Sequence, residues 1–280
     1  MPELPEVESL RLALARQLVG SVVREARLLR ADMLHREHDA PPMPLQPGGR
    51  VTALHRHGKQ LVIESPQGGC LLVHLGMSGS LRLLAQPPEG ELHVHAWWRF
   101  DRADGAPCWL RHRDPRRFGW LESHADTTSV HRRCWSLLGP DALHVSVDSL
   151  TASLRSTRRP LKAALLDQSC VAGLGNIYVD EALFRARLHP ATRTNRLRDE
   201  HLRRLASCIR ATLRKAVELG GSTIQDHRTA DGTWGSFQRL HRVYGRANLP
   251  CKRCGAVLTG VRSAQRATVF CATCQPRRPT

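Results

Sequence analysis

The 280-residue sequence contains no run of about 18 apolar residues, the length that a helix needs to cross a bilayer. Its opening, MPELPEVESL, carries acids and lacks the apolar stretch of a secretory signal. Glycine-rich motifs for dinucleotides or nucleoside triphosphates are also missing, which predicts that no organic cofactor binds. We therefore expect a soluble, cytoplasmic protein with no membrane partner.

Lysine is scarce, because the chain has 38 arginines and only four lysines, at positions 59, 162, 215 and 252. Arginine stays protonated at every working pH, whereas a desolvated lysine can exchange a proton. Lys59 is the one lysine of the N-terminal half and stands in the segment HGKQ, before an apolar strand. It is a candidate acid–base residue; the alternative is an ordinary surface lysine.

Acidic residues are few in the C-terminal half. Residues 151–280 hold 24 Lys and Arg against 8 Asp and Glu, a net charge of +16. Residues 1–150 hold 18 against 17, a net charge of +1. Basic charge gathered in one half favours a polyanionic partner, and nucleic acid is the most common one. An ordinary solvated surface is the alternative.

Hydrophobic periodicity predicts an α+β protein. Residues 5–20 are expected to form a helix, with Pro5 in its first turn and an apolar stripe of leucines. The short apolar runs that follow predict a β-sandwich. The helical period then returns and predicts helices near 147–156, 160–168, 176–187 and 197–219. The expected parts are a catalytic β domain (1–125), a linker (126–146), a helical domain (147–241) and a zinc finger (242–276).

Four of the nine cysteines form two CxxC pairs at the C-terminus, while the other five are scattered, unlike a disulfide framework. The pairs, Cys251 with Cys254 and Cys271 with Cys274, have the spacing of a four-thiolate zinc site. Four thiolates leave no open position, so one structural Zn²⁺ is expected. A unit of about 30 residues buries too little apolar surface to fold without such help.

Pro2 follows the initiator methionine, and removal of Met1 would expose its secondary amine. An α-amino group has an ordinary pKa of about 8, so a useful fraction is unprotonated at neutral pH. Such an amine can attack a sugar C1′ and form an iminium ion. Glu3 and Glu6 supply carboxylates within one helical turn for acid–base steps. Without further context, the same residues are simply a good helix start.

Seven segments in order resemble the formamidopyrimidine-DNA glycosylase family. They are PELPEVE (2–8), HLGMSGSL (74–81), DPRRFG (114–119), GLGNIY (173–178), VYGR (243–246), QRAT (265–268) and the four-cysteine finger. The resemblance implies a β-sandwich, a helical domain with a helix-two-turn-helix motif, and a zinc hairpin. It also implies a monomeric, bacterial, nucleoid-associated enzyme that acts on double-stranded DNA containing oxidised purines or abasic sites.

The resemblance implies a bifunctional glycosylase and AP lyase that excises 8-oxoguanine and formamidopyrimidines and cleaves the strand by β,δ-elimination. Pro2 would be the Schiff-base nucleophile, and Glu3 the acid that assists base loss, with Glu6 in support. Lys59 would move protons and contact phosphate. Arg266 would assist the second elimination.

The resemblance also implies the DNA contacts. Met77, Arg116 and Phe118 would fill the gap left by a flipped base, since an emptied stack needs a wedge. Phosphates around the lesion would be contacted by His93, Asn176, Arg158 and Arg266.

Two segments depart from the family pattern. Thr157 stands where the family often has a basic residue, and 234–237 read Trp-Gly-Ser-Phe instead of Pro-Gly-Tyr-Phe, which leaves the role of 226–238 open.

Two alternative functions remain at this point. An endonuclease VIII-like enzyme for oxidised pyrimidines usually begins Pro-Glu-Gly-Pro-Glu, and Leu4 argues against it. A non-catalytic DNA-binding zinc protein would explain the charge and cysteines but not Pro2.

Overall fold

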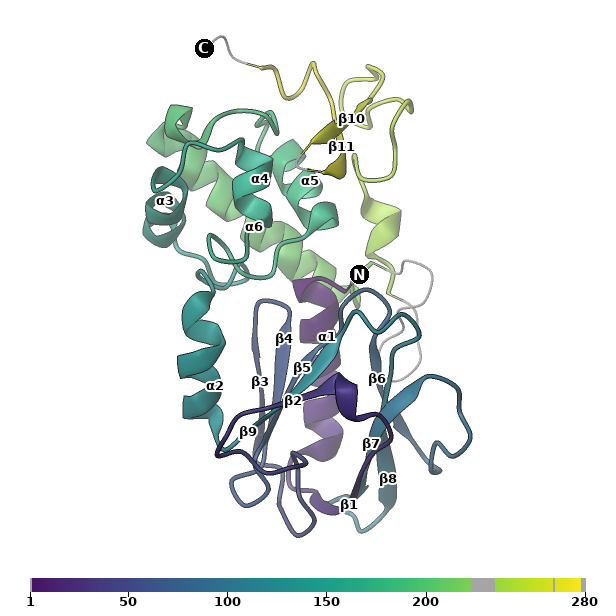
Figure 1. Ribbon diagram of the computed structural model, residues 1–280. Coiled ribbons are helices and arrows are strands. Elements are labelled where there is room, and N and C mark those ends of the chain that lie inside the picture. Colours follow the sequence, from purple (N-terminus) through teal and green to yellow (C-terminus); the bar gives the residue numbers. More distant parts are fainter. Residues whose placement is uncertain (1, 223–234, 264, 278–280) are drawn as a thin grey trace. The chain divides into compact units, whose positions relative to one another are not determined.

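The computed structural model describes residues 2–222, 235–263 and 265–277. The chain divides into two compact units (Figure 1). Unit 1 comprises Met1–Ser136 together with Gly220–Gly235, and unit 2 comprises Leu137–Leu219 together with Ser236–Thr280. No helix in the described part of the chain is both long and apolar enough to cross a membrane.

Unit 1 is built on two β-sheets, as the sequence predicts (Figure 1). The antiparallel four-stranded sheet has the order β1 (Val22–Leu28), β7 (Val94–Asp101), β8 (Pro107–Arg113), β6 (Ser80–Leu84). The five-stranded sheet has the order β2 (Leu34–Arg36), β9 (Trp120–His124), β5 (Cys70–His74), β4 (Gln60–Glu64), β3 (Ala53–His57). Only the short strand β2 runs parallel to its neighbour within this sheet.

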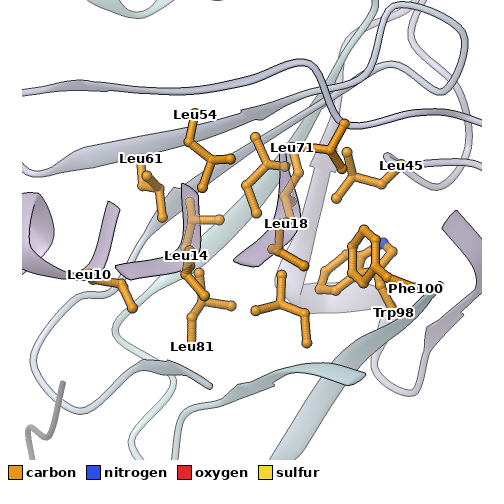
Figure 2. Close-up of a cluster of buried hydrophobic side chains, with 14 of the residues drawn as sticks. Leu10, Leu14, Leu18, Leu45, Leu54, Leu61, Leu71, Leu81, Trp98 and Phe100 are labelled. Carbon is orange, nitrogen blue, oxygen red and sulfur yellow. The ribbon is translucent and has the colours of Figure 1, made fainter. Parts of the chain in front are cut away.

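Helix α1 (Leu4–Leu18) packs into the core that both sheets share. Its apolar stripe, Leu10, Leu14 and Leu18, is fully buried. Figure 2 shows these leucines among side chains from the two sheets, with Leu54, Leu61 and Leu71 from one, and Leu81, Trp98 and Phe100 from the other. The helix that carries the chain start is therefore fixed by the main core of unit 1.

The expected linker, 126–146, contains helix α2 (Thr127–Arg133) within unit 1. Asp126 caps it by accepting a 2.7 Å hydrogen bond from the Ser129 N–H. The sequence pattern does not reveal this helix because it is short and polar and buries only Ser129 and Val130. Short 3₁₀ turns complete the chain at Ala31–Met33, Trp135–Leu137, Thr194–Arg196 and Phe237–Leu240.

Unit 2 has four helices in its described residues, close to the ranges that periodicity predicts: α3 (Val147–Arg155), α4 (Leu161–Leu166), α5 (Asn176–Arg185) and α6 (Asp199–Glu218). A hairpin follows, made of β10 (Thr259–Ser263) and β11 (Arg266–Phe270). Val269 of this hairpin packs against Phe184 of α5, and so does Leu258, the residue before β10.

Two buried carboxylates of α5 hold the C-terminal segment in place. Glu181 accepts hydrogen bonds of 2.9 Å from the backbone N–H groups of Arg242, which precedes VYGR, and of the first two residues of that motif. Asp180 pairs with Lys162 of α4 at 2.7 Å and accepts a bond from the Val269 N–H. Loss of one partner would leave a buried charge unpaired, which is strongly destabilising. These contacts therefore hold the hairpin against the helices.

Candidate active site and zinc centre

The N-terminus of α1 begins with a buried acid. Glu3 is the N-cap residue and is only 2% exposed. Its side chain accepts from the backbone of Glu6, while its own N–H donates a 2.8 Å bond to the Glu6 carboxylate. This capping box satisfies N–H groups at the start of the helix. Pro2 is also buried, immediately before this turn.

Glu6 reaches a second segment as well. Its Oε1 atom accepts a 2.7 Å hydrogen bond from the Ser222 N–H. Gly221 has a φ of +82°, and a Cβ atom there would lie 2.4 Å from the same oxygen. Glycine is therefore required at this place by both backbone conformation and space.

Lys59 lies in a two-residue turn between β3 and β4, since His57 pairs with Gln60. Arg56 holds this turn by donating a 3.0 Å hydrogen bond to the Gly58 carbonyl. The same guanidinium pairs with Glu8 of α1 at 2.8 Å, and its side chain is only 4% exposed. The turn that carries half-buried Lys59 is thus fixed to helix α1.

His74 is a residue that the sequence analysis did not single out. It ends β5 and stacks on Trp120, with ring centroids 5.4 Å apart. Its Nδ1 accepts a 3.2 Å bond from the Gly76 N–H. Burial, and then the positive charge of Lys59, lower the pKa of His74 to about 4. The ring is therefore neutral at physiological pH.

Met77 and Phe118 are exposed apolar side chains, at 43% and 51%. They stand on two turns whose backbones are in contact, because a Cβ on Gly76 would lie 2.3 Å from the Gly119 nitrogen. The Arg116 guanidinium lies 4.6 Å from the centre of the Phe118 ring. Arg116 and Phe118 therefore share one turn, and Met77 lies on the turn in contact with it; these are the three residues for which the family resemblance implies a wedge.

Asp114 connects these two turns, although the sequence analysis gave it no role. It is fully buried, accepts a 2.5 Å bond from the Ser78 hydroxyl and a 2.8 Å bond from the Gly119 N–H. Its carboxylate also lies 3.3 Å from the backbone nitrogen of Arg116. Its own N–H donates to the carbonyl of exposed His93, a residue with a φ of +67°.

In unit 2, Asn176 is the first residue of α5, and its Nδ2 donates a 2.9 Å bond to the Ala267 carbonyl. Lys162 donates to the same carbonyl at 3.0 Å. The Oδ1 atom of Asn176 is buried and has no hydrogen-bond partner among the described residues. Arg266 precedes Ala267 and is exposed. One contact network thus positions two of the expected phosphate-binding residues.

The backbone around Thr157 forms hydrogen bonds with other residues of unit 2. Its carbonyl accepts a 2.5 Å bond from the Thr194 hydroxyl, and the Arg158 carbonyl accepts from Arg193. The Arg158 side chain is exposed. Arg159 pairs with Asp167 at 2.8 Å. Residues 226–234 of the expected lesion-covering loop lie outside the described residues, as does Met1.

The four C-terminal cysteines converge as expected. Their sulfur atoms all lie within 4.8 Å of one another, and those of Cys254 and Cys271 are 3.5 Å apart. A zinc tetrahedron with Zn–S bonds of about 2.3 Å requires sulfurs about 3.8 Å apart. The N–H groups of Arg253 and Cys274 lie 3.4 Å from the sulfurs of Cys251 and Cys271. The residues fit one structural Zn²⁺.

Comparison with known proteins assigns these features to one family. Residues 1–121 match the formamidopyrimidine-DNA glycosylase N-terminal domain, residues 138–228 its H2TH domain, and residues 248–277 the zinc finger found in FPG and IleRS. The formamidopyrimidine-DNA glycosylase of Ruegeria pomeroyi is 39% identical, with 98% of this chain and 100% of that protein covered.

Two solved structures are similar over 99% of this chain and 100% of theirs. One is the MutM (Fpg) protein of Thermus thermophilus, with a TM-score of 0.83 and 39% identity. The other is a complex between a Lactococcus lactis FPG mutant and DNA containing Fapy-dG, with a TM-score of 0.85 and 31% identity. This chain belongs to the formamidopyrimidine-DNA glycosylase family.

Proposed function

We propose that this base-excision-repair glycosylase attacks C1′ of a damaged nucleotide with the secondary amine of Pro2, after removal of Met1. The new N–C1′ bond replaces the bond to the base, which leaves. The C1′–O4′ bond then breaks, O4′ takes a proton, and the open-chain iminium ion forms. This ion acidifies the C2′ proton, and loss of that proton expels the 3′ phosphate by β-elimination. A second, δ-elimination expels the 5′ phosphate and completes strand cleavage.

The observation that carries this proposal is the position of Pro2 directly before a capped helix start. The N-terminus of α1 is the positive end of the helix dipole, which disfavours a protonated amine there. An unprotonated amine is the nucleophilic form, so this position suits attack at neutral pH. Family membership supports the same assignment.

Glu3 is suited to proton transfer because it is buried beside Pro2 and its backbone is fixed by Glu6. We assign Glu3 as the acid that assists base loss and opening of the sugar ring, with Glu6 as its positioning partner. Lys59 would move protons and contact the adjacent phosphate from a turn fixed to the same helix.

The substrate is double-stranded DNA that carries oxidised purines or abasic sites. The Lactococcus lactis relative was solved with DNA containing Fapy-dG, which supports formamidopyrimidines as substrates. Chemistry at C1′ requires the nucleotide to leave the base stack. Met77 and Phe118 would occupy the space it vacates, and Arg116 would read the orphaned base through paired hydrogen bonds.

The phosphate contacts would come from His93, Asn176, Arg158 and Arg266. Asn176 sits at a helix N-terminus, where backbone N–H groups favour an anion. Zinc supplies folding free energy to the hairpin that carries Arg266. We further propose that the enzyme works as a monomer in the cytoplasm, at the nucleoid where its DNA lies.

Borohydride trapping on lesion DNA tests the nucleophile, since reduction of the iminium leaves chain and DNA covalently joined. We expect the mature chain to be trapped, and a chain verified by mass spectrometry to retain Met1 not to be. Glu3→Gln, with its amine intact, should bind lesion DNA but cleave roughly 10²–10⁴-fold more slowly. Normal cleavage by the Met1-retaining chain would exclude Pro2 as the nucleophile.

A further inference from the structure

Three potential metal ligands meet in unit 1, apart from the four-cysteine centre. Cys134 Sγ lies 3.6 Å from a Glu122 carboxylate oxygen and 3.8 Å from His124 Nε2. His124 Nε2 lies 3.6 Å from the same Glu122 oxygen. The three atoms form a nearly equilateral triangle. An N···O separation of 3.6 Å is too long for a direct hydrogen bond.

We propose that Glu122, His124 and Cys134 form a second metal site, which takes Zn²⁺ or another borderline divalent transition metal. Bond lengths of about 2.0–2.3 Å to nitrogen, oxygen and sulfur give tetrahedral edges of about 3.4–3.6 Å. The observed triangle would contract by only a few tenths of an ångström around such an ion. A mixed sulfur, nitrogen and oxygen donor set favours these metals over Mg²⁺ or Ca²⁺.

The orientation of His124 supports this site. Its side chain is fully buried, and its Nδ1 lies 3.2 Å from the buried carboxylate of Glu37. Glu37 is balanced by Arg133 at 2.6 Å and accepts from the Ser129 hydroxyl. A histidine that donates Nδ1–H to a carboxylate presents the Nε2 lone pair outward, which is the usual arrangement behind a metal-bound imidazole.

The fold produces the cluster from two elements. Glu122 and His124 are alternate residues of β9, so they point to the same face of the sheet. Cys134 follows α2 directly as its C-cap residue, and α2 packs against β9. Glu122 is 24% exposed, which leaves an access side for an ion, and His35 lies opposite it on β2. The fourth position belongs to solvent.

The zinc content of the full chain tests this proposal, after saturation with Zn²⁺ and removal of the excess by gel filtration. We expect one ion beyond the four-cysteine centre in the parent chain. Cys134→Ser and His124→Asn should each lose that ion. The matched control Cys208→Ser changes another half-buried cysteine outside both clusters and should retain both ions.

Glu122→Gln provides a milder variant if loss of a buried imidazole unfolds the unit. It replaces a charged oxygen ligand with a neutral amide, so the second ion should pass to a chelator at a lower concentration than the parent requires. A parent chain with only one zinc ion overturns the proposal. A second ion that survives in both Cys134→Ser and Glu122→Gln, with unchanged chelator resistance, also overturns it.

Discussion

The Oε1 atom of Glu6 accepts a 2.7 Å hydrogen bond from the backbone N–H of Ser222, which joins the first turn of α1 to a distant part of the chain. The other carboxylate oxygen accepts from the Glu3 N–H. One carboxylate therefore connects the proposed catalytic acid with the segment that begins at Gly221.

Gly221→Ala should disturb this connection, because the new Cβ would lie 2.4 Å from Glu6 Oε1. We expect single-turnover cleavage of lesion DNA to slow by about tenfold or more, which corresponds to about 1.4 kcal/mol or more. The control is Gly90→Ala, which has a similarly positive φ of +69° but no atom within 4 Å of the added Cβ. Equal rates in the two variants would mean that contact with Glu6 is irrelevant to catalysis.

His74 predicts a loss of stability in mild acid. Its pKa is lowered from 6.5 to about 4 by burial and by the charge of Lys59, so the fold favours the neutral ring. The contribution of this neutral ring to the free energy of unfolding is fully present above pH 6.5 and is lost as the pH falls towards 4. Thermal unfolding measured between these values should show a smaller decline for His74→Gln than for the parent. His38→Gln, at a side chain 95% exposed, should follow the parent curve.

Cys254→Ser should lose the finger's zinc ion and much of the affinity for lesion DNA. A structural zinc supplies about 10–16 kcal/mol of folding free energy, more than the small hairpin can replace. The core of unit 1, with Trp98 and Phe100, should remain folded. Zinc analysis, DNA binding and near-ultraviolet circular dichroism together check this. Full lesion affinity in zinc-free protein would contradict it.

The parent enzyme should prefer cytosine over adenine opposite 8-oxoguanine, because cytosine offers acceptors to the Arg116 guanidinium. A good paired contact discriminates by about 1–3 kcal/mol, hence roughly 5- to 150-fold in rate. Arg116→Ala should remove this preference and leave trapping through Pro2 intact. Arg117→Ala is the control, because the Arg117 side chain lies 3.5 Å from Asp32. A preference that persists in Arg116→Ala would assign the reading to another residue.

Local patterns predict the parts of this chain that local physics determines. The leucine stripe and Pro5 identify α1, and the CxxC pairs identify the zinc ligands. Helix α2 is missed because its stability comes from an N-cap and packing on β9 rather than from an apolar stripe.

The sequence also could not indicate residues whose roles depend on distant partners. Asp114 acquires its role from Ser78 on another turn. Lys162 shares with Lys59 the distinction of being a rare lysine, yet it is a fully buried partner of Asp180. The scarcity of lysine in the sequence therefore does not by itself distinguish a lysine proposed for proton transfer from one that forms a buried ion pair.

The backbone contact between Gly76 and Gly119 bears on the proposed entry of Met77 and Phe118 into the base stack. Fixing the backbone of one residue costs about 1–2 kcal/mol of conformational entropy. The two turns that carry Met77 and Phe118 lose this entropy during folding, because contacts with each other and with Asp114 hold them in place. We expect the chain to probe successive base pairs with a preformed probe, so that sampling of undamaged DNA requires no loop rearrangement.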